Sequence, residues 1–355
     1  MAVNETLASF SNTLVYSSML VYTGALGAFA VDLSGRGRVA ATQADRSAAQ
    51  APAAKAAAQA VAKASAGRVP AVVGSPRRSV TDPVTTYGAT ADAAIPDAAA
   101  SGRSRAGGIA VALTWLALLL HVGGVVARGV SVQRAPFGNM YEFAVTGSVV
   151  VTAVYLFVLA RRDVRYLGTF VVGPVLLTLG LAVSVFYTQA AQLVPALHSF
   201  WLVIHVSVAF VSSALFTLGF STSVLQLVQE RREQHRAAGN EPRRGRFMDA
   251  LPTSVDLERS AYRLHVVAFP LWTFTVIAGA IWAEAAWGKY WNWDPKEVWS
   301  FVIWVVYAGY LHARVTRGWD GRRAAYFALA GYGCLLFNFL VVNVFFVGMH
   351  SYAGS

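Results

Sequence analysis

Apolar and polar residues alternate along this chain in long blocks rather than in short periodic patterns. Apolar runs of about 20 residues recur, which is the length that an α-helix needs to cross a bilayer at 1.5 Å per residue. Only α-helices satisfy their own backbone hydrogen bonds in such open spans, so the pattern predicts an all-α polytopic membrane bundle. The expected spans cover residues 12–33, 107–127, 143–161, 167–187, 201–228, 263–283, 298–316 and 324–347.

The charged residues indicate how these eight spans are oriented. The net charge is +11, but the distribution of charge does not fit a nucleic-acid-binding surface. Of the 29 Lys and Arg residues, 25 lie in one set of alternating loops. Basic loops stay in the cytoplasm. We therefore expect a multi-pass protein of the bacterial plasma membrane, embedded in the lipid bilayer, with both termini outside and no nucleic-acid partner.

Composition divides the chain into three parts. Residues 1–34 read as an N-terminal membrane anchor, although Ala28-Phe29-Ala30 also resembles a signal-peptide cleavage site. Residues 35–106 are rich in Ala, Pro and Arg and poor in large apolar side chains, so we expect a disordered cytoplasmic linker. Residues 107–355 form the predicted membrane core. The single cysteine, Cys334, leaves this chain without a CxxCH haem-attachment motif or a CxxC redox pair.

Tryptophan is concentrated in one outer loop, at 284–299. The stretch Trp287–Trp299 reads WGKYWNWDPKEVW and holds four Trp residues, at 287, 291, 293 and 299. An aromatic belt places isolated Trp residues at the ends of several helices, whereas this cluster could also form a platform for a flat apolar ligand. Asp294, Pro295 and Glu297 have the spacing of a helix N-terminus, with Asp294 as the cap.

Two histidines are expected at the same membrane level as the tryptophan loop. His205 lies near the outer end of the fifth span, and His350 follows the last span. Two imidazoles that approach an aromatic shelf could serve as axial ligands of haem iron. Interfacial histidines bonded to water are the alternative, and His198 is a rival ligand on the same side.

His312 is expected at a different depth. It lies about 16 residues into the seventh span, roughly 24 Å from the outer end, and an ionisable residue at such depth is a candidate functional residue. His121 lies only ~9 Å from the outer end of the second span. His265 is level with His312, so the pair is geometrically allowed. Otherwise a second ligand must come from another subunit.

These motifs together resemble a known family. The segment WGKYWNWDPKEVWSFVIWVVYAGYLH is similar to the tryptophan-rich "WWD" signature of the haem-handling proteins of cytochrome c maturation. The segments WLVIHV around His205 and GMHSY around His350 match the CcsA/ResC branch, called CcsB in some bacteria. The resemblance covers about residues 107–355. The WWD signature alone would also fit CcmC and CcmF, but the chain length and the eight spans favour CcsA/ResC.

The resemblance implies a function in system II cytochrome c maturation. Haem b would be carried outward as cargo and held at the WWD loop, with His205 and His350 as iron ligands and His312 in a second, intramembrane haem site. Trp287, Trp291, Trp293 and Trp299 would contact the cofactor. No residue of this chain would act as a catalytic group itself; Trp291, Trp293 and Asp294 would position the haem.

The resemblance also implies partners. A ResB/Ccs1-type membrane subunit would complete a cytochrome c synthase and supply the other intramembrane histidine. The synthase would attach haem to the CxxCH thiols of apocytochrome c, and a thiol-reducing thioredoxin-like protein could assist. Lys289, Lys296 and Arg128 are outer cations that could meet the haem propionates, or could simply snorkel to the interface.

Two features depart from the family pattern, and two other functions remain open. The Ala-rich linker is not part of the family core, and residues 131–143 match it only loosely, so no role is carried over to Arg128, Asn139 or Glu142. A diheme b-type electron-transfer protein would use the in-chain pair His265 and His312. A permease without haem would instead favour helix breaks at the midplane.

Overall fold

The computed structural model describes residues 3–66, 104–192, 199–240 and 246–350. Within these ranges, eight helices are long and apolar enough to cross a membrane, as the hydropathy pattern predicts. They are α1 (Glu5–Ala66), α2 (Arg105–Val132), α3 (Met140–Arg161), α4 (Gly168–Ser184), α5 (Phe200–Ala237), α6 (Ser254–Trp287), α7 (Pro295–Arg317) and α8 (Gly321–Leu336). The protein is a multi-pass helical membrane protein.

The short elements connect or extend these helices. A 3-10 turn, η2 (Arg165–Leu167), precedes α4, and another, η4 (Arg246–Ala250), precedes α6. The last span continues from α8 through a π-helical segment, η5 (Phe337–Val342), into α9 (Asn343–Phe345). A π-segment inside a helix widens its turn and often marks a functional site.

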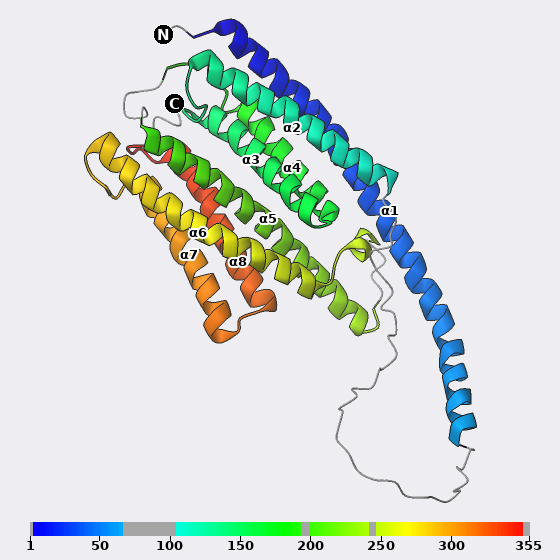
Figure 1. Cartoon of the computed structure of the whole chain (residues 1–355). Helices are drawn as coiled ribbons and strands as arrows, with labels where there is room; N and C mark the ends of the chain where they lie inside the picture. The colour runs from blue at the N-terminus through cyan, green and yellow to red at the C-terminus, as the bar shows by residue number, and fades with distance from the viewer. Residues whose placement is uncertain (1–2, 67–103, 193–198, 241–245, 351–355) are drawn as a thin grey trace, which may run out of the picture.

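The long helices run side by side in one bundle (Figure 1). α1 packs along α2, and α5 packs along α6. One buried core joins α1–α4 with part of α5, and a second core joins α5, α6, α7 and α8. A third, smaller cluster contains Leu202, Val206, Phe210 and Trp282, with Trp287 packed against it. This third cluster lies beside the loop between α6 and α7.

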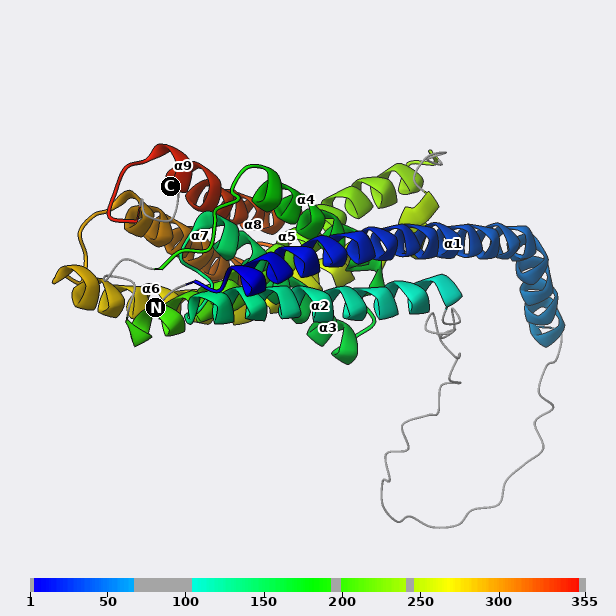
Figure 2. The ribbon, with the colours of Figure 1, turned by 90° about the horizontal axis from the view of Figure 1, so that it is seen from above.

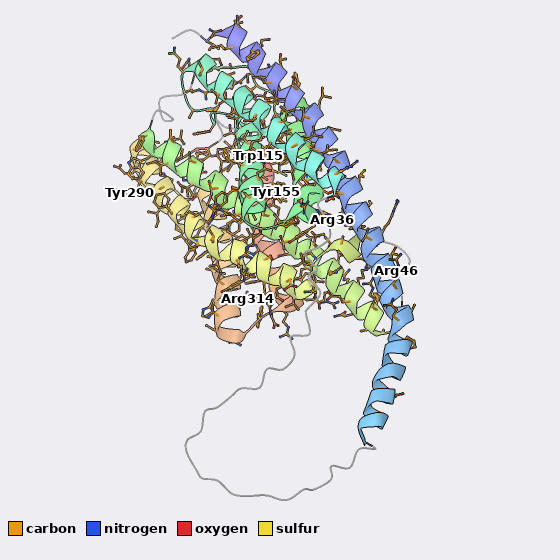
Figure 3. All side chains as sticks on the ribbon, turned by 45° about the vertical axis from the view of Figure 1, so that its right-hand side comes forward. Arg36, Arg46, Trp115, Tyr155, Tyr290 and Arg314 are labelled. Atoms are coloured by element: carbon orange, nitrogen blue, oxygen red, sulfur yellow. The ribbon has the colours of Figure 1, made fainter. Side chains whose placement is uncertain are left out.

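One end of the bundle gathers the segments that carry the sequence motifs. The α6–α7 loop and the segment after α9 lie at the same end of the bundle as the start of α1 in both views (Figures 1 and 2). Tyr290 of the α6–α7 loop and Arg314 near the end of α7 lie at opposite ends of the bundle (Figure 3). Arg314 pairs there with Glu258.

The first helix is longer than the expected anchor of residues 1–34. It extends into the range 35–106, for which the sequence predicts disorder. α1 continues without interruption to Ala66, past the end of the bundle (Figure 2). Alanine has the highest intrinsic helix propensity, so a segment too poor in apolar residues to form a core can still be helical. Residues 67–103 of the expected linker lie outside the described residues, and its cytoplasmic location stays a prediction.

Candidate functional site

A cavity of about 260 Å³ lies where helices α3 to α8 and the α6–α7 loop meet. Its walls are mostly apolar and aromatic, with Phe143, Phe210, Trp272, Trp282 and Phe339 among them. Three polar atoms of wall residues, Thr275 Oγ1, Glu297 Oε1 and Asn338 Oδ1, are buried without a hydrogen-bond partner in the described part of the chain. Buried polar atoms are normally satisfied, so the cavity has the character of a site for an apolar ligand with some polar groups.

His205 reaches this cavity from the second turn of α5. Its Nδ1 lies 2.8 Å from the carbonyl oxygen of Thr275, one helix away, and therefore donates its proton there. That bond fixes the tautomer with Nε2 as the acceptor nitrogen, which is the form that binds a metal. Gly279 provides the space for the ring, because a Cβ at this position would lie 2.7 Å from His205 Cε1.

His350 reaches the same cavity from the loop after α9. Its Nδ1 donates to Asp294 Oδ2 at 2.8 Å. A histidine oriented by a carboxylate in this way would bind a metal through Nε2, and the carboxylate raises the basicity of the ring. The sequence therefore predicted correctly that both histidines approach one place, and the structure shows that each is oriented through Nδ1.

Asp294 has two roles in this arrangement. It caps α7 within a capping box completed by Glu297, as the sequence predicts. The backbone N–H groups of Lys296 and Met349 also donate to its carboxylate. Burial alone would raise the pKa of Asp294, but the hydrogen bond from His350 and these N–H groups hold that pKa below its usual range. The carboxylate is thus kept ionised beside the imidazole.

The indole of Trp282 connects the two histidines. It lies nearly parallel to the His205 ring at 6.1 Å between centroids, and 5.6 Å from the His350 ring. The two imidazoles are therefore less than about 12 Å apart, because each lies within 6.1 Å of the same indole. Trp282 was not among the predicted site residues, since its position inside a span gave no sign that it faces both histidines.

The four tryptophans of the predicted shelf do not all face the cavity. Trp291 lines it. Trp287 packs edge-on against His350 at 4.9 Å between centroids. Trp293 is 76% exposed, with its ring perpendicular to that of Trp291, and has a left-handed backbone with φ of 58°. Trp299 packs against Phe337. The structure thus gathers Trp287 and Trp291 with the histidines, and places Trp293 and Trp299 beyond the cavity wall.

The histidines outside the cavity lie in different environments. His312 is exposed on the surface of α7. His265 is buried in α6, against the rings of Tyr307 and Tyr310. Residues two apart on a helix point about 200° away from each other, so the face of α7 that carries Tyr310 is not the face that carries His312. This arrangement disfavours an in-chain pair of His265 and His312. His198 lies outside the described residues.

His121 and the outer arginines belong to other contacts. His121 is buried among α1–α3, with Nδ1 3.5 Å from the Tyr22 hydroxyl. Arg128 and Arg134 both bind the buried Glu142 carboxylate, at 3.1 and 2.7 Å. Asn139 caps α3 by accepting from the Glu142 N–H. This ion cluster joins the α2–α3 loop to the backbone after α4, a role that the loose family match of residues 131–143 did not reveal.

Comparison with known proteins places this architecture in a family. A family model described as "Cytochrome C assembly protein" matches residues 113–350. A cytochrome c biogenesis protein CcsA of Synechococcus elongatus is 35% identical over 286 residues, which cover 69% of this chain and 86% of the relative. A CcsA of Guillardia theta is 36% identical over 234 residues, covering 61% of this chain and 76% of the relative.

A solved structure has a similar fold. The cytochrome c haem lyase CcmF aligns with a TM-score of 0.57 and 14% sequence identity, over 96% of this chain and 47% of that one. This chain thus spans about half the length of CcmF, and the likeness concerns the fold alone. The family match and the CcsA relatives together show that the chain belongs to the cytochrome c assembly protein family, among the CcsA proteins of cytochrome c biogenesis.

Proposed function

We propose that this chain holds haem b as cargo in the cavity beside the WWD loop, with His205 and His350 as the two axial ligands of the iron. The observation that carries the proposal is the pair of imidazoles that line one cavity, each with Nδ1 engaged by an oxygen atom. Both rings are thereby prepared for metal binding through Nε2. The surrounding aromatic walls fit the flat apolar body of a porphyrin.

The chain would act by positioning haem rather than by supplying a reacting group. A thiol of the CxxCH motif in apocytochrome c adds across a haem vinyl group, so that a C–S bond forms and the thiol proton passes to the other vinyl carbon. This addition has no leaving group. The protein would hold the porphyrin and exclude water while the thiols approach. The distribution of basic loops supports an outward-facing cavity.

The synthase activity would belong to a complex. His312 is exposed on α7, and an exposed ionisable side chain within a membrane span is costly unless a partner covers it. We propose that a ResB/Ccs1-type subunit packs against this face and supplies a second histidine for an intramembrane haem. Apocytochrome c would then meet the complex at the opposite end of the bundle, beside the WWD loop.

The proposal is tested by co-expressing this chain, the partner subunit and a CxxCH reporter in bacteria without their own cytochrome c maturation. We expect covalent haem on the reporter only when both subunits are present. Replacing His205 or His350 with Gly should reduce reporter haem to background, and imidazole in the medium should restore part of it. His235→Gly is the matched control, because His235 is exposed at the charged end of α5.

Two outcomes would contradict the proposal. Full maturation by both Gly variants without imidazole would remove His205 and His350 as ligands. Redox-active haem in the purified chain, combined with no haem on the reporter under any condition, would favour the b-type electron-transfer function. An absence of haem in the visible spectrum of the purified protein would favour a permease.

A further inference from the structure

A single ammonium group lies on the wall of the cavity that the two histidines share. Lys296 is in the first turn of α7 and lines both this cavity and a smaller one toward α9. Its Nζ donates to the side-chain oxygen of Asn343. Asn343 is itself held in place, because its amide nitrogen donates to the Phe339 carbonyl at 2.8 Å. The cation is therefore fixed in position.

Neither nearby carboxylate, Asp294 or Glu297, forms an ion pair with Lys296 in the described part of the chain. Asp294 pairs with His350 and accepts from backbone N–H groups. Glu297 Oε2 accepts from the N–H groups of Asn292 and Asp294, and Glu297 Oε1 has no hydrogen-bond partner in the described part of the chain. An ammonium has three N–H donors, and an amide oxygen satisfies one of them without neutralising the charge. A cation removed from water is costly unless it is paired, so the arrangement favours an anionic group on the bound ligand.

The other outer cations do not offer this arrangement. Arg128 is buried in its ion pair with Glu142, and Arg134 binds the same carboxylate. Lys289 is exposed in the α6–α7 loop. Among the outer cations Arg128, Lys289 and Lys296, Lys296 is thus the one that the described structure places on the cavity wall.

We propose that Lys296 is a binding residue for a carboxylate of the ligand, and that it orients the ligand in the cavity. Resting on the proposed function, that carboxylate is a haem propionate. Both propionates lie at one edge of the porphyrin and the vinyl groups lie away from that edge. Anchoring a propionate at Lys296, at the positive N-terminal end of α7, would turn the vinyl groups toward the part of the site remote from Asn343.

The test compares ferric haem b with its dimethyl ester, which has the same ring and iron but no free carboxylate. Both are titrated into the full-length detergent-solubilised chain and followed by the Soret band. We expect the wild-type chain to prefer haem b by about tenfold, the effect of one charged hydrogen bond. Lys296→Met should bind the two compounds about equally, and Lys296→Arg should keep part of the preference. Lys289→Met is the matched control and should keep all of it.

The preference is the ratio of the affinities of one variant for haem b and for the dimethyl ester. A general loss of affinity therefore does not change it. If Lys296→Met does not fold, Asn343→Asp places a carboxylate against the ammonium and should reduce the preference in the same way. A preference that persists in Lys296→Met or in Asn343→Asp, or equal binding by the wild-type chain, would overturn the assignment of Lys296. Absence of binding of either compound by the wild-type chain would instead overturn the proposed function.

Discussion

His350 Nδ1 donates a hydrogen bond to Asp294 Oδ2 at 2.8 Å, across 56 positions of the chain. The bond joins the loop after the last span to the N-terminus of α7. Gly348 permits this close approach, because an added Cβ there would overlap the Asp294 carboxylate. One carboxylate thus caps a helix and orients a candidate metal ligand, so the conformation of the α6–α7 loop and the direction of the His350 ring are coupled.

Replacing Asp294 with Asn should separate these two roles. Asparagine is about as good an N-cap as aspartate, so α7 should begin normally while the charged bond to His350 is lost. We expect a loss of about 1–2 kcal/mol in stability at pH 7, measured by thermal unfolding in detergent. Haem bound to the purified chain should also fall, because the imidazole loses its orienting carboxylate.

The stability difference should depend on pH. The pKa of Asp294 in the folded protein is held below its ordinary value of 3.8. Its stabilising contribution is therefore present above pH ~3.8 and disappears as the pH falls through the lower folded-state pKa. The melting temperatures of wild type and Asp294→Asn should converge in acid. A gap that widens in acid, or an unchanged haem content, would show that the bond does not orient His350.

Adding one methyl group at Gly279 should disturb His205. A Cβ there would lie 2.7 Å from His205 Cε1 and 2.9 Å from Nδ1, closer than real Cβ contacts allow. The ring must move and weaken its bond to the Thr275 carbonyl. We expect Gly279→Ala to reduce bound haem several-fold. Gly180→Ala is the matched control, because a Cβ at Gly180 meets nothing within 4 Å. Equal haem content in the two variants would argue against His205 as a ligand.

The sequence was sufficient to predict the spans and the convergence of His205 and His350. Span length and loop charge determine the end of the bundle at which a residue lies, and both histidines fall at the end that carries the α6–α7 loop. The capping box at Asp294 was also predictable and is confirmed, because capping depends on neighbours within four positions.

Contacts between distant elements could not be derived in this way. The bond from His205 to Thr275 spans 70 positions, and the one from Lys296 to Asn343 spans 47. Which wall atom faces a histidine depends on helix rotation, and span length carries no information about rotation. The same limit explains Trp299, which shares the motif with Trp291 but turns toward Phe337.

Replacement of Trp291 should lower the haem content more than replacement of Trp293. Trp291 lines the cavity, whereas Trp293 is 76% exposed. We expect Trp291→Ala to lower co-purified haem at least threefold with little change in the amount of protein in the membrane. Trp293→Ala should change haem content less, since its indole has little contact to lose. If Trp293→Ala has the larger effect, the shelf must form on the exposed side of the loop.

Substitutions of His265 and His312 should have different effects on the stability of the chain. His265 is fully buried against Phe216, Tyr307 and Tyr310, so His265→Ala leaves a cavity in a packed core. We expect it to destabilise the chain by about 2–4 kcal/mol, by analogy with other large-to-small core substitutions. His312 is exposed, and His312→Ala should leave the melting temperature of the isolated chain nearly unchanged.

In the complex, we expect the haem content to depend on His312 and not on His265. His312→Ala should reduce the haem that co-purifies with this chain and the proposed ResB/Ccs1-type partner, because the proposed intramembrane site would lose one of its two ligands. His265→Leu, which refills the core volume, should keep that haem and separates the effect of the imidazole from that of packing. Equal dependence on His265 and His312 in the chain without its partner would establish an in-chain pair, despite the different faces on which the two residues lie.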